Sequence, residues 1–249
     1  MTEATDDSGA TTDDHLLGGR VSLRQPACGY RAAIDPVLLA AAVPAAAGER
    51  VLDLGCGVGA AMLCLAVRIP GVFVTGLERQ ADLAGLALAN IAANGLAQRA
   101  RVVHGEVATL EGLASERFDH VMMNPPFLAA GSGTRSPHAT KGLSTTEGDA
   151  DLALWVDAAH RALVPRGWLT LIHRADRFDT AVAALAPRYG AVTLISLWPR
   201  AGEPARRVLI RARKGVRSPA TIHPGLVLHG ADGAYSERAR RILEEAAAL

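Results

Sequence analysis

Short apolar runs alternate with stretches of helical periodicity through the middle of the chain. Runs at 51–54, 72–78, 100–104, 118–124 and 168–173 predict strands, and the segments 58–68, 80–94 and 150–163 predict helices between them. Asp35 and Pro36 are typical of a helix start, as N-cap and first-turn residue, and predict a helix through Val43. This alternation favours an α/β fold with a parallel sheet covered on both faces.

Two strand-like runs, 191–198 and 205–212, follow one another with only a short polar link. They predict an antiparallel hairpin at the end of a seven-stranded, mostly parallel, Rossmann-like sheet. The expected divisions are a disordered acidic tail (1–14), an N-terminal extension with a helix (15–49), the main domain (50–214) and a C-terminal segment (215–249) that closes with a helix from about Ser236 to Ala248.

Composition narrows the class of protein. The 249 residues are 49% hydrophobic, which suits one large domain and excludes wholesale disorder. No apolar stretch is long enough to span a bilayer, and the acidic first residues lack the features of a signal peptide. Three cysteines without metal-ligand spacing, and histidines without shared spacing, predict a cytoplasmic protein with no metal site and no membrane partner.

Charge is unevenly distributed. The formal net charge is +1, but residues 1–14 hold five acidic and no basic residues, so the remainder carries +6. The segment 199–219 holds seven cations against Glu203 alone. Such a cluster suits a polyanionic partner. An arginine-rich composition explains it equally well, because 24 of the 26 basic residues are arginine.

A glycine loop stands where the first strand should turn into its helix. Gly55, Gly57 and Gly59 allow a tight turn and a close approach of backbone to a ligand. Alone, this spacing also fits a dinucleotide fingerprint, and Glu78, at the end of the second strand, suits the ribose of either NAD or S-adenosylmethionine. Asp53 favours the second ligand, because its carboxylate would repel a pyrophosphate and attract an ammonium and a sulfonium.

The tetrapeptide Asn124-Pro125-Pro126-Phe127 ends the fourth strand of the main domain. The two prolines stiffen the turn and remove backbone donors. The Asn124 side-chain oxygen and the Pro125 carbonyl can accept both N–H bonds of an exocyclic amine or amide, which aims the nitrogen lone pair at a methyl donor. Phe127 offers a face on which a base can stack. Positioning and fixed dipoles would then supply the rate, without a required general base.

With the glycine loop and its acids, these residues resemble class I S-adenosylmethionine-dependent methyltransferases, and the tetrapeptide is similar to that of amino-group methyltransferases. From about Leu17 onward the chain resembles the tRNA-valine adenine-N6 methyltransferase family. The residues that carry this likeness are Gln25, Gly29, Tyr30, Arg31, Asp35, Asp53, Leu54, Gly55, Cys56, Gly57, Glu78, Asn124, Pro125, Pro126, Phe127, Lys214 and Gly215.

The resemblance implies S-adenosyl-L-methionine as cofactor and structured RNA, most simply tRNA, as partner. The implied cofactor contacts are Arg31, Asp35, Asp53, Gly55, Cys56, Gly57, Gly59, Glu78, Glu106, Val107 and Asn124. Glu106 stands where the family usually has aspartate. The candidate RNA contacts are Arg200, Arg206, Arg207 and Lys214, with Arg135 and Lys141 in the long polar loop 125–148.

Four other interpretations stay open at this point. A guanine-N2 rRNA methyltransferase uses the same tetrapeptide, and a glutamine-N5 protein methyltransferase generally has tyrosine in place of Phe127. An NAD-dependent dehydrogenase is compatible with the glycine spacing. A non-catalytic RNA-binding module on the same fold is the fourth.

Overall fold

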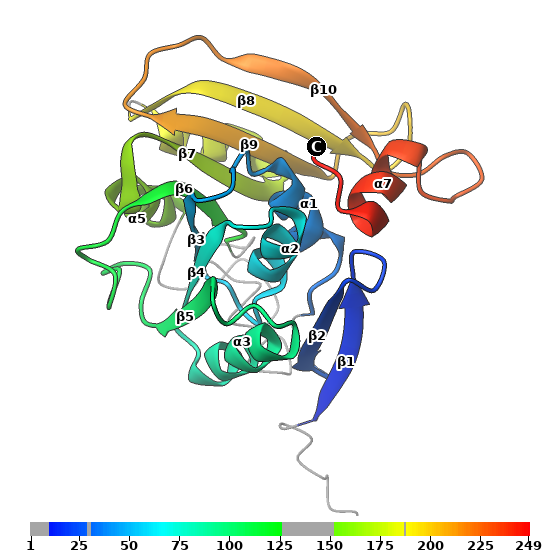
Figure 1. The fold of residues 1–249 in the computed structure, drawn as a ribbon. Coiled ribbons are helices and arrows are strands. Elements are labelled where there is room, and N and C mark those ends of the chain that lie inside the picture. The colour runs from blue at the N-terminus through cyan, green and yellow to red at the C-terminus, as the bar shows by residue number, and fades with distance from the viewer. Residues whose placement is uncertain (1–9, 29–30, 126–151, 187) are drawn as a thin grey trace, which may run out of the picture.

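A single twisted sheet of eight strands forms the centre of the molecule (Figure 1). The computed structural model describes residues 10–28, 31–125, 152–186 and 188–249. The strand order is β10-β8-β9-β7-β6-β3-β4-β5. In chain order the strands are β3 (Arg50–Leu54), β4 (Phe73–Glu78), β5 (Ala100–His104), β6 (Phe118–Met123), β7 (Leu163–Arg174), β8 (Tyr189–Trp198), β9 (Arg207–Lys214) and β10 (Thr221–Val227).

Every neighbouring pair in this sheet is parallel except those of β9, which runs antiparallel to both β7 and β8. The predicted terminal hairpin is therefore confirmed. The sheet has one strand more than the seven predicted, because β10 adds to the edge beside β8. Its Pro224 and Gly225 resemble a loop in sequence, but an edge strand tolerates a proline beside a register shift, and such a shift separates His223 from Leu226.

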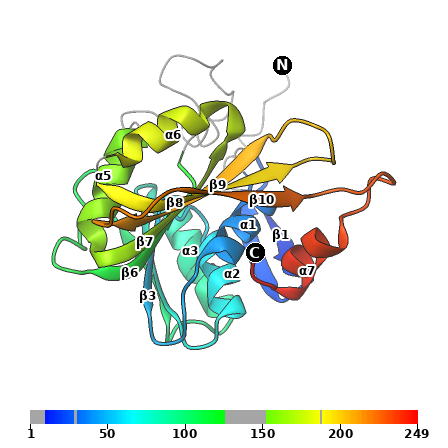
Figure 2. The same ribbon diagram turned by 90° about the horizontal axis from the view of Figure 1, so that it is seen from above.

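Helices cover both faces of the sheet, as the two views show (Figures 1 and 2). Alternate residues of β3 divide between the two apolar cores: Val51 packs with one set of helices, and Leu52 and Leu54 pack with the other. On the Val51 side lie α1 (Ile34–Ala42), α2 (Ala60–Arg68), α3 (Ala81–Ala93) and α7 (Glu237–Glu245). On the other side lie α5 (Leu152–Ala162) and α6 (Phe178–Leu185), which a short 3-10 turn (Ala175–Arg177) precedes.

The N-terminal part of the chain forms an antiparallel hairpin of β1 (Thr11–Leu16) and β2 (Val21–Pro26). The expected disordered tail 1–14 was wrong for 11–14, which belong to β1. These residues are polar because β1 alternates between exposed and half-buried positions, so they do not show an apolar pattern. Residues 1–9 lie outside the described residues.

The helix boundaries differ from prediction by one to three residues, and one helix was not predicted. Asp35 lies within the first turn of α1, and Ala33 is the N-cap. The last helix has the predicted Ser236 cap, whose Oγ accepts a hydrogen bond from the Ala239 N–H at 3.2 Å, but it ends at Glu245. Helix α6 buries only Ala181 and Leu185, which left a weak apolar signal. Across the part of the chain that the structure describes, no helix has the length and apolarity to cross a membrane.

Candidate active site

The carboxyl edge of the parallel strands brings three of the predicted site residues together. Leu54 of β3 is in register with Leu77 of β4 and with Met123 of β6. The residues that follow these three are Gly55, Glu78 and Asn124, so they lie side by side at one edge of the sheet. Ligands bind at this edge in open α/β sheets.

The glycine loop after β3 has the backbone conformation that only glycine adopts readily. Gly55, Gly57 and Gly59 have φ values of +68°, +56° and +87°. A β-carbon on Gly55 would collide with the ring of Trp155 on α5, whereas one on Gly57 would meet no described heavy atom within 4 Å. Gly55 therefore packs on the protein, and Gly57 presents open backbone at the site.

Cys56, between these glycines, belongs to the core. Its side chain is buried, and its Sγ would lie 2.5 Å from a β-carbon on Gly76. Burial, followed by the charges of Asp53 and Glu78, raises the pKa of the Cys56 thiol well above its usual range. The thiol is therefore neutral, and a contact of Cys56 with the cofactor stays a prediction.

Glu78 is fixed by the loop that it faces. Its Oε2 accepts a hydrogen bond from the Gly57 N–H at 2.9 Å, and its Oε1 accepts one from the Gln80 N–H at 2.9 Å. The side chain is only 5% exposed. Each carboxylate oxygen has a further lone pair, so Glu78 can still accept hydroxyl donors. Its predicted role as the ribose contact stays a prediction.

Asp53 is the least satisfied acid of the site. It is 2% exposed, and its Oδ2 is buried without a hydrogen-bond partner among the described residues. Burial, and secondarily the charge of Glu78, raises the pKa of Asp53 to about 8, although a hydrogen bond from the Met62 backbone lowers it. A cation from a ligand would satisfy this oxygen and restore the charged carboxylate. The site therefore fits a ligand with a positive group.

The two remaining segments of the edge follow β5 and β6. Glu106 is exposed and Val107 is buried in the turns that connect β5 to β6. The Gly105 N–H donates to the Glu78 carbonyl at 3.0 Å, which places this segment beside β4. Asn124 is half-buried and Pro125 is buried. Pro126 and Phe127 lie outside the described residues, as do Arg135 and Lys141.

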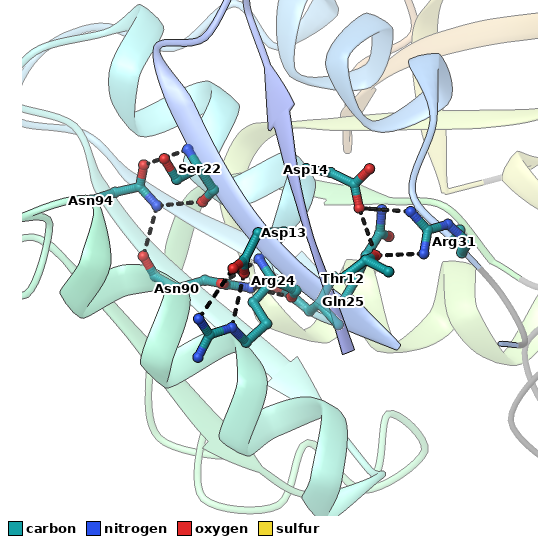
Figure 3. Close-up of polar contacts among 10 residues, drawn as sticks. Thr12, Asp13, Asp14, Ser22, Arg24, Gln25, Arg31, Asn90 and Asn94 are labelled. Atoms are coloured by element: carbon teal, nitrogen blue, oxygen red, sulfur yellow. Dashed lines mark hydrogen bonds and ion pairs between the residues drawn. The ribbon is translucent and has the colours of Figure 1, made fainter. Parts of the chain in front are cut away.

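Arg31 and Asp35, which were expected near the cofactor, hold other parts of the protein. Arg31 donates to the Asp14 carboxylate and the Thr12 hydroxyl, each at 2.6 Å (Figure 3). Asp35 accepts a hydrogen bond from Nε of Arg207 at 3.0 Å. Arg31 thus holds the N-terminal hairpin against the stretch before α1, and Asp35 connects α1 to β9. A direct role of either residue toward the cofactor stays a prediction.

The basic residues of segment 199–219 are not one patch. Strand β9 begins at the carboxyl edge, where Arg207 is in register with Arg174, and ends near the other edge, where Lys214 pairs with Tyr189. Arg200 and Arg206 are exposed in the link that precedes β9. Lys214 donates to the carbonyls of His160 and Leu163, both at 2.7 Å. Lys214 thus caps the end of α5, and its predicted RNA contact stays a prediction.

The sequence analysis named Gln25 without assigning it a role and did not single out Asn90 or Asn94, and all three have structural contacts here. Gln25 is 1% exposed; its amide donates to Asp14, and its oxygen accepts the Ala32 N–H. Asn90 on α3 and Asn94, the C-cap of that helix, accept hydrogen bonds from backbone N–H groups of β2. Only the four-residue spacing of the two asparagines, which places them on one side of a helix, could have indicated this contact.

The glycine loop, the two buried carboxylates and the Asn-Pro pair at this sheet edge define a class I methyltransferase, whose cofactor is S-adenosylmethionine. A model of the methyltransferase small domain family matches residues 32–195, and the chain belongs to this family. Within the described ranges, no group of three or more potential metal ligands is present.

Relatives with this fold are similar over most of their length. The tRNA1(Val) (adenine(37)-N6)-methyltransferase of Porphyromonas gingivalis is 32% identical over 237 residues, which are 90% of this chain and 91% of the relative. The enzyme of the same name from Aeromonas hydrophila is 30% identical over 214 residues, 85% and 87% of the two chains. The crystal structure of a predicted O-methyltransferase from Agrobacterium tumefaciens superposes with a TM-score of 0.72 at 30% identity, covering 86% of this chain and 98% of that one.

Proposed function

We propose that this protein transfers the methyl group of S-adenosylmethionine to the exocyclic N6 of an adenine in tRNA. The observation that carries the proposal is the position of Asn124-Pro125 directly beside the glycine loop, at the sheet edge that also holds Asp53 and Glu78. The names of the Porphyromonas and Aeromonas relatives support adenine N6 and tRNA.

Each acid has a separate part in holding the cofactor. Asp53 would pair with the ammonium of the cofactor's methionine moiety, because its buried Oδ2 needs a positive partner. Glu78, already fixed by the Gly57 and Gln80 N–H groups, would accept the ribose hydroxyls. The exposed Glu106 would accept a hydrogen bond from the amino group of the cofactor's adenine. When bound, the cofactor supplies an electrophilic methyl group on a sulfonium.

The Asn-Pro pair would position the acceptor. The target base must leave its stack to reach the site. The Asn124 side-chain oxygen and the Pro125 carbonyl would then accept the two N–H bonds of the amino group, and Phe127 would stack on the base. This arrangement holds the lone pair of a weak nucleophile toward the methyl group. It favours an amine over a hydroxyl acceptor, because both protein groups are hydrogen-bond acceptors.

RNA would approach over the carboxyl edge. Arg200, Arg206 and Arg207 lie there and would contact phosphates, together with Arg135 and Lys141 of the loop 125–148. Lys214 is not included, because it caps α5.

The test combines a methyltransferase assay with nucleoside mass spectrometry. Purified protein, labelled S-adenosylmethionine and an unmodified tRNA-valine transcript should give N6-methyladenosine, and RNA from a strain that lacks the gene should have lost it. Asn124→Ala should abolish turnover while cofactor affinity, measured by calorimetry, stays within a few-fold. N2-methylguanosine as the product would favour the rRNA-type alternative, and retained turnover in Asn124→Ala would reject the proposed alignment of the amine.

A further inference from the structure

A second group of basic residues lies away from the carboxyl edge, on the face of the sheet that α1 and α7 cover in part. Arg211 of β9, His223 of β10 and Arg238 of α7 make up this group, which we call the β9–α7 cluster. Arg211 shares its face of β9 with Leu209 and Arg207, which contact the α1 side of the molecule. None of the three residues belongs to the site described above.

The charges of Arg211 and Arg238 both act on the imidazole of His223. Burial, and then the positive charges of Arg238 and Arg211, lowers the pKa of His223. Burial also lowers the pKa of Arg211, whose Nε is buried without a hydrogen-bond partner among the described residues. Both charges that act on His223 are thus positive, and that of Arg211 is partly removed from solvent. Such a cluster is stabilised when an anion binds to it.

Each member offers a donor for that anion. The Gly225 N–H donates to Nδ1 of His223 at 3.0 Å, so the hydrogen of the neutral ring is on Nε2. Arg238 is exposed and has no hydrogen bond or ion pair with any described residue. The three acids of α7, Glu237, Glu244 and Glu245, all pair with Arg240, and none of them pairs with Arg238.

The register of the sheet fixes the position of the cluster relative to the cofactor site. One cross-strand row runs from Asp53 through Met122 and Thr170 to Arg211, and continues to Thr193 and Thr221. Asp53 faces α2, on the same side as Arg211. Strands lie about 4.8 Å apart, so Arg211 is about 14 Å, and β10 about 24 Å, from β3 across the sheet. A single nucleoside in the catalytic site cannot reach this cluster.

We propose that the β9–α7 cluster binds the phosphate backbone of the substrate RNA, at a point separate from the target base. This inference rests on the proposed function and deepens it, because it makes the substrate a structured polynucleotide held at two places. Charge complementarity selects the occupant: the guanidinium groups of Arg211 and Arg238 are two positive charges beside the His223 ring, and neither has an ion pair with a described acidic side chain. An RNA bound in this way contacts the protein at the catalytic edge and at the β9–α7 cluster. Both contacts then position the target base.

The test measures the affinity of an unmodified tRNA-valine transcript in the presence of S-adenosylhomocysteine at several salt concentrations. Arg238→Ala is the main variant, because its exposed side chain has no structural partner. Each lost phosphate contact lowers the slope of log Kd against log salt by about 0.9, which corresponds to about fivefold weaker binding at 0.15 M salt. His223→Ala removes a neutral donor and should weaken binding with a smaller change of slope.

Arg117→Ala is the matched control. Arg117 is also an exposed arginine, but it immediately precedes β6, at the amino end of that strand. Its loss should leave both affinity and slope unchanged, and cofactor affinity should be the same in every variant. Equal binding by Arg238→Ala and the wild type would overturn the inference, as would equal losses in Arg238→Ala and Arg117→Ala, which would indicate a general effect of charge. Failure of the wild type to bind RNA at all would instead reject the proposed function.

Discussion

Arg207 and Asp35 form an ion pair with an Nε–Oδ2 distance of 3.0 Å between residues 172 positions apart. The pair joins the first turn of α1 to the start of β9 at the carboxyl edge. Both side chains are partly buried, with exposures of 34% for Arg207 and 19% for Asp35. The contact therefore fixes the terminal hairpin against the helix that precedes the main domain.

We expect Asp35→Asn to lower the free energy of unfolding by about 1 kcal/mol, the upper range for a pair that retains some solvent. Chemical denaturation of Asp35→Asn, Arg207→Gln and the double variant would isolate the pairwise energy. Glu203→Gln, which breaks the exposed pair with Arg200, is the control and should change stability by less than about 0.5 kcal/mol. A coupling energy of zero for Asp35 and Arg207 would contradict the assignment.

The raised pKa of Asp53 predicts a pH dependence of the ligand-free protein. The folded state keeps the proton up to about pH 8, whereas the unfolded chain releases it near the ordinary value of 3.8. The folded state therefore binds more protons between these values, and stability falls as pH rises through this window, by at most about 1.4 kcal/mol per pH unit. Asp53→Asn should be more stable than the wild type at pH 8 and equally stable near pH 4.

The difference between the two thermal unfolding profiles is the quantity to measure. His173 changes stability in the opposite direction. Burial lowers its pKa to about 4, so its contribution to the free energy of unfolding is lost as pH falls below 6.5. This effect is the same in the wild type and in Asp53→Asn, so it cancels in the difference. Cofactor should bind more tightly as pH rises toward 8 in the wild type, since its ammonium requires the ionised Asp53. Asp53→Asn should bind it poorly at every pH. Parallel stability profiles would show that Asp53 is ionised in the folded protein.

Gly57→Ala tests whether the cofactor occupies the open side of the glycine loop. The substitution strains a residue at φ +56° and places a methyl group in space that no described protein atom fills. We expect a stability loss of about 1–2 kcal/mol and at least a tenfold loss of cofactor affinity. Gly95→Ala is a matched control, because Gly95 has φ +67° and equally open surroundings at the end of α3. It should lose similar stability and keep its cofactor affinity.

The sequence predicted the parallel core and the edge residues because both depend on local patterns. Gly55, Glu78 and Asn124 each end or follow an apolar strand, and in any parallel arrangement of these strands the three residues lie at the same sheet edge. The positions of the cations could not be predicted in the same way. Arg207 and Lys214 are close in sequence, but a strand of eight residues carries them to opposite edges of the sheet.

The N-terminal hairpin was missed for a related reason. Strand β1 is polar. One edge of β2 pairs with β1, and the other edge is held by the side chains of Asn90 and Asn94 rather than by another strand. Asn90 accepts the Arg24 N–H and donates to the Arg24 carbonyl, while Asn94 makes the same pair of contacts with Ser22 (Figure 3). Such long-range contacts leave no periodic signal in the sequence.

Asn90 also links this hairpin to the active site, and the link is testable. Its amide donates to the Val58 carbonyl in the glycine loop at 2.9 Å, and the side chain is 2% exposed. Asn90→Leu should lower the free energy of unfolding by about 3 kcal/mol, because the Arg24 and Val58 backbone groups lose their partner. It should also weaken cofactor binding, since Val58 lies between Gly57 and Gly59. Asn94→Leu, which affects only the contacts of Ser22 and the helix backbone, should lose about 1 kcal/mol and bind cofactor normally. Equal cofactor affinities in the two variants, measured by calorimetry below their unfolding temperatures, would show that the hairpin does not support the loop.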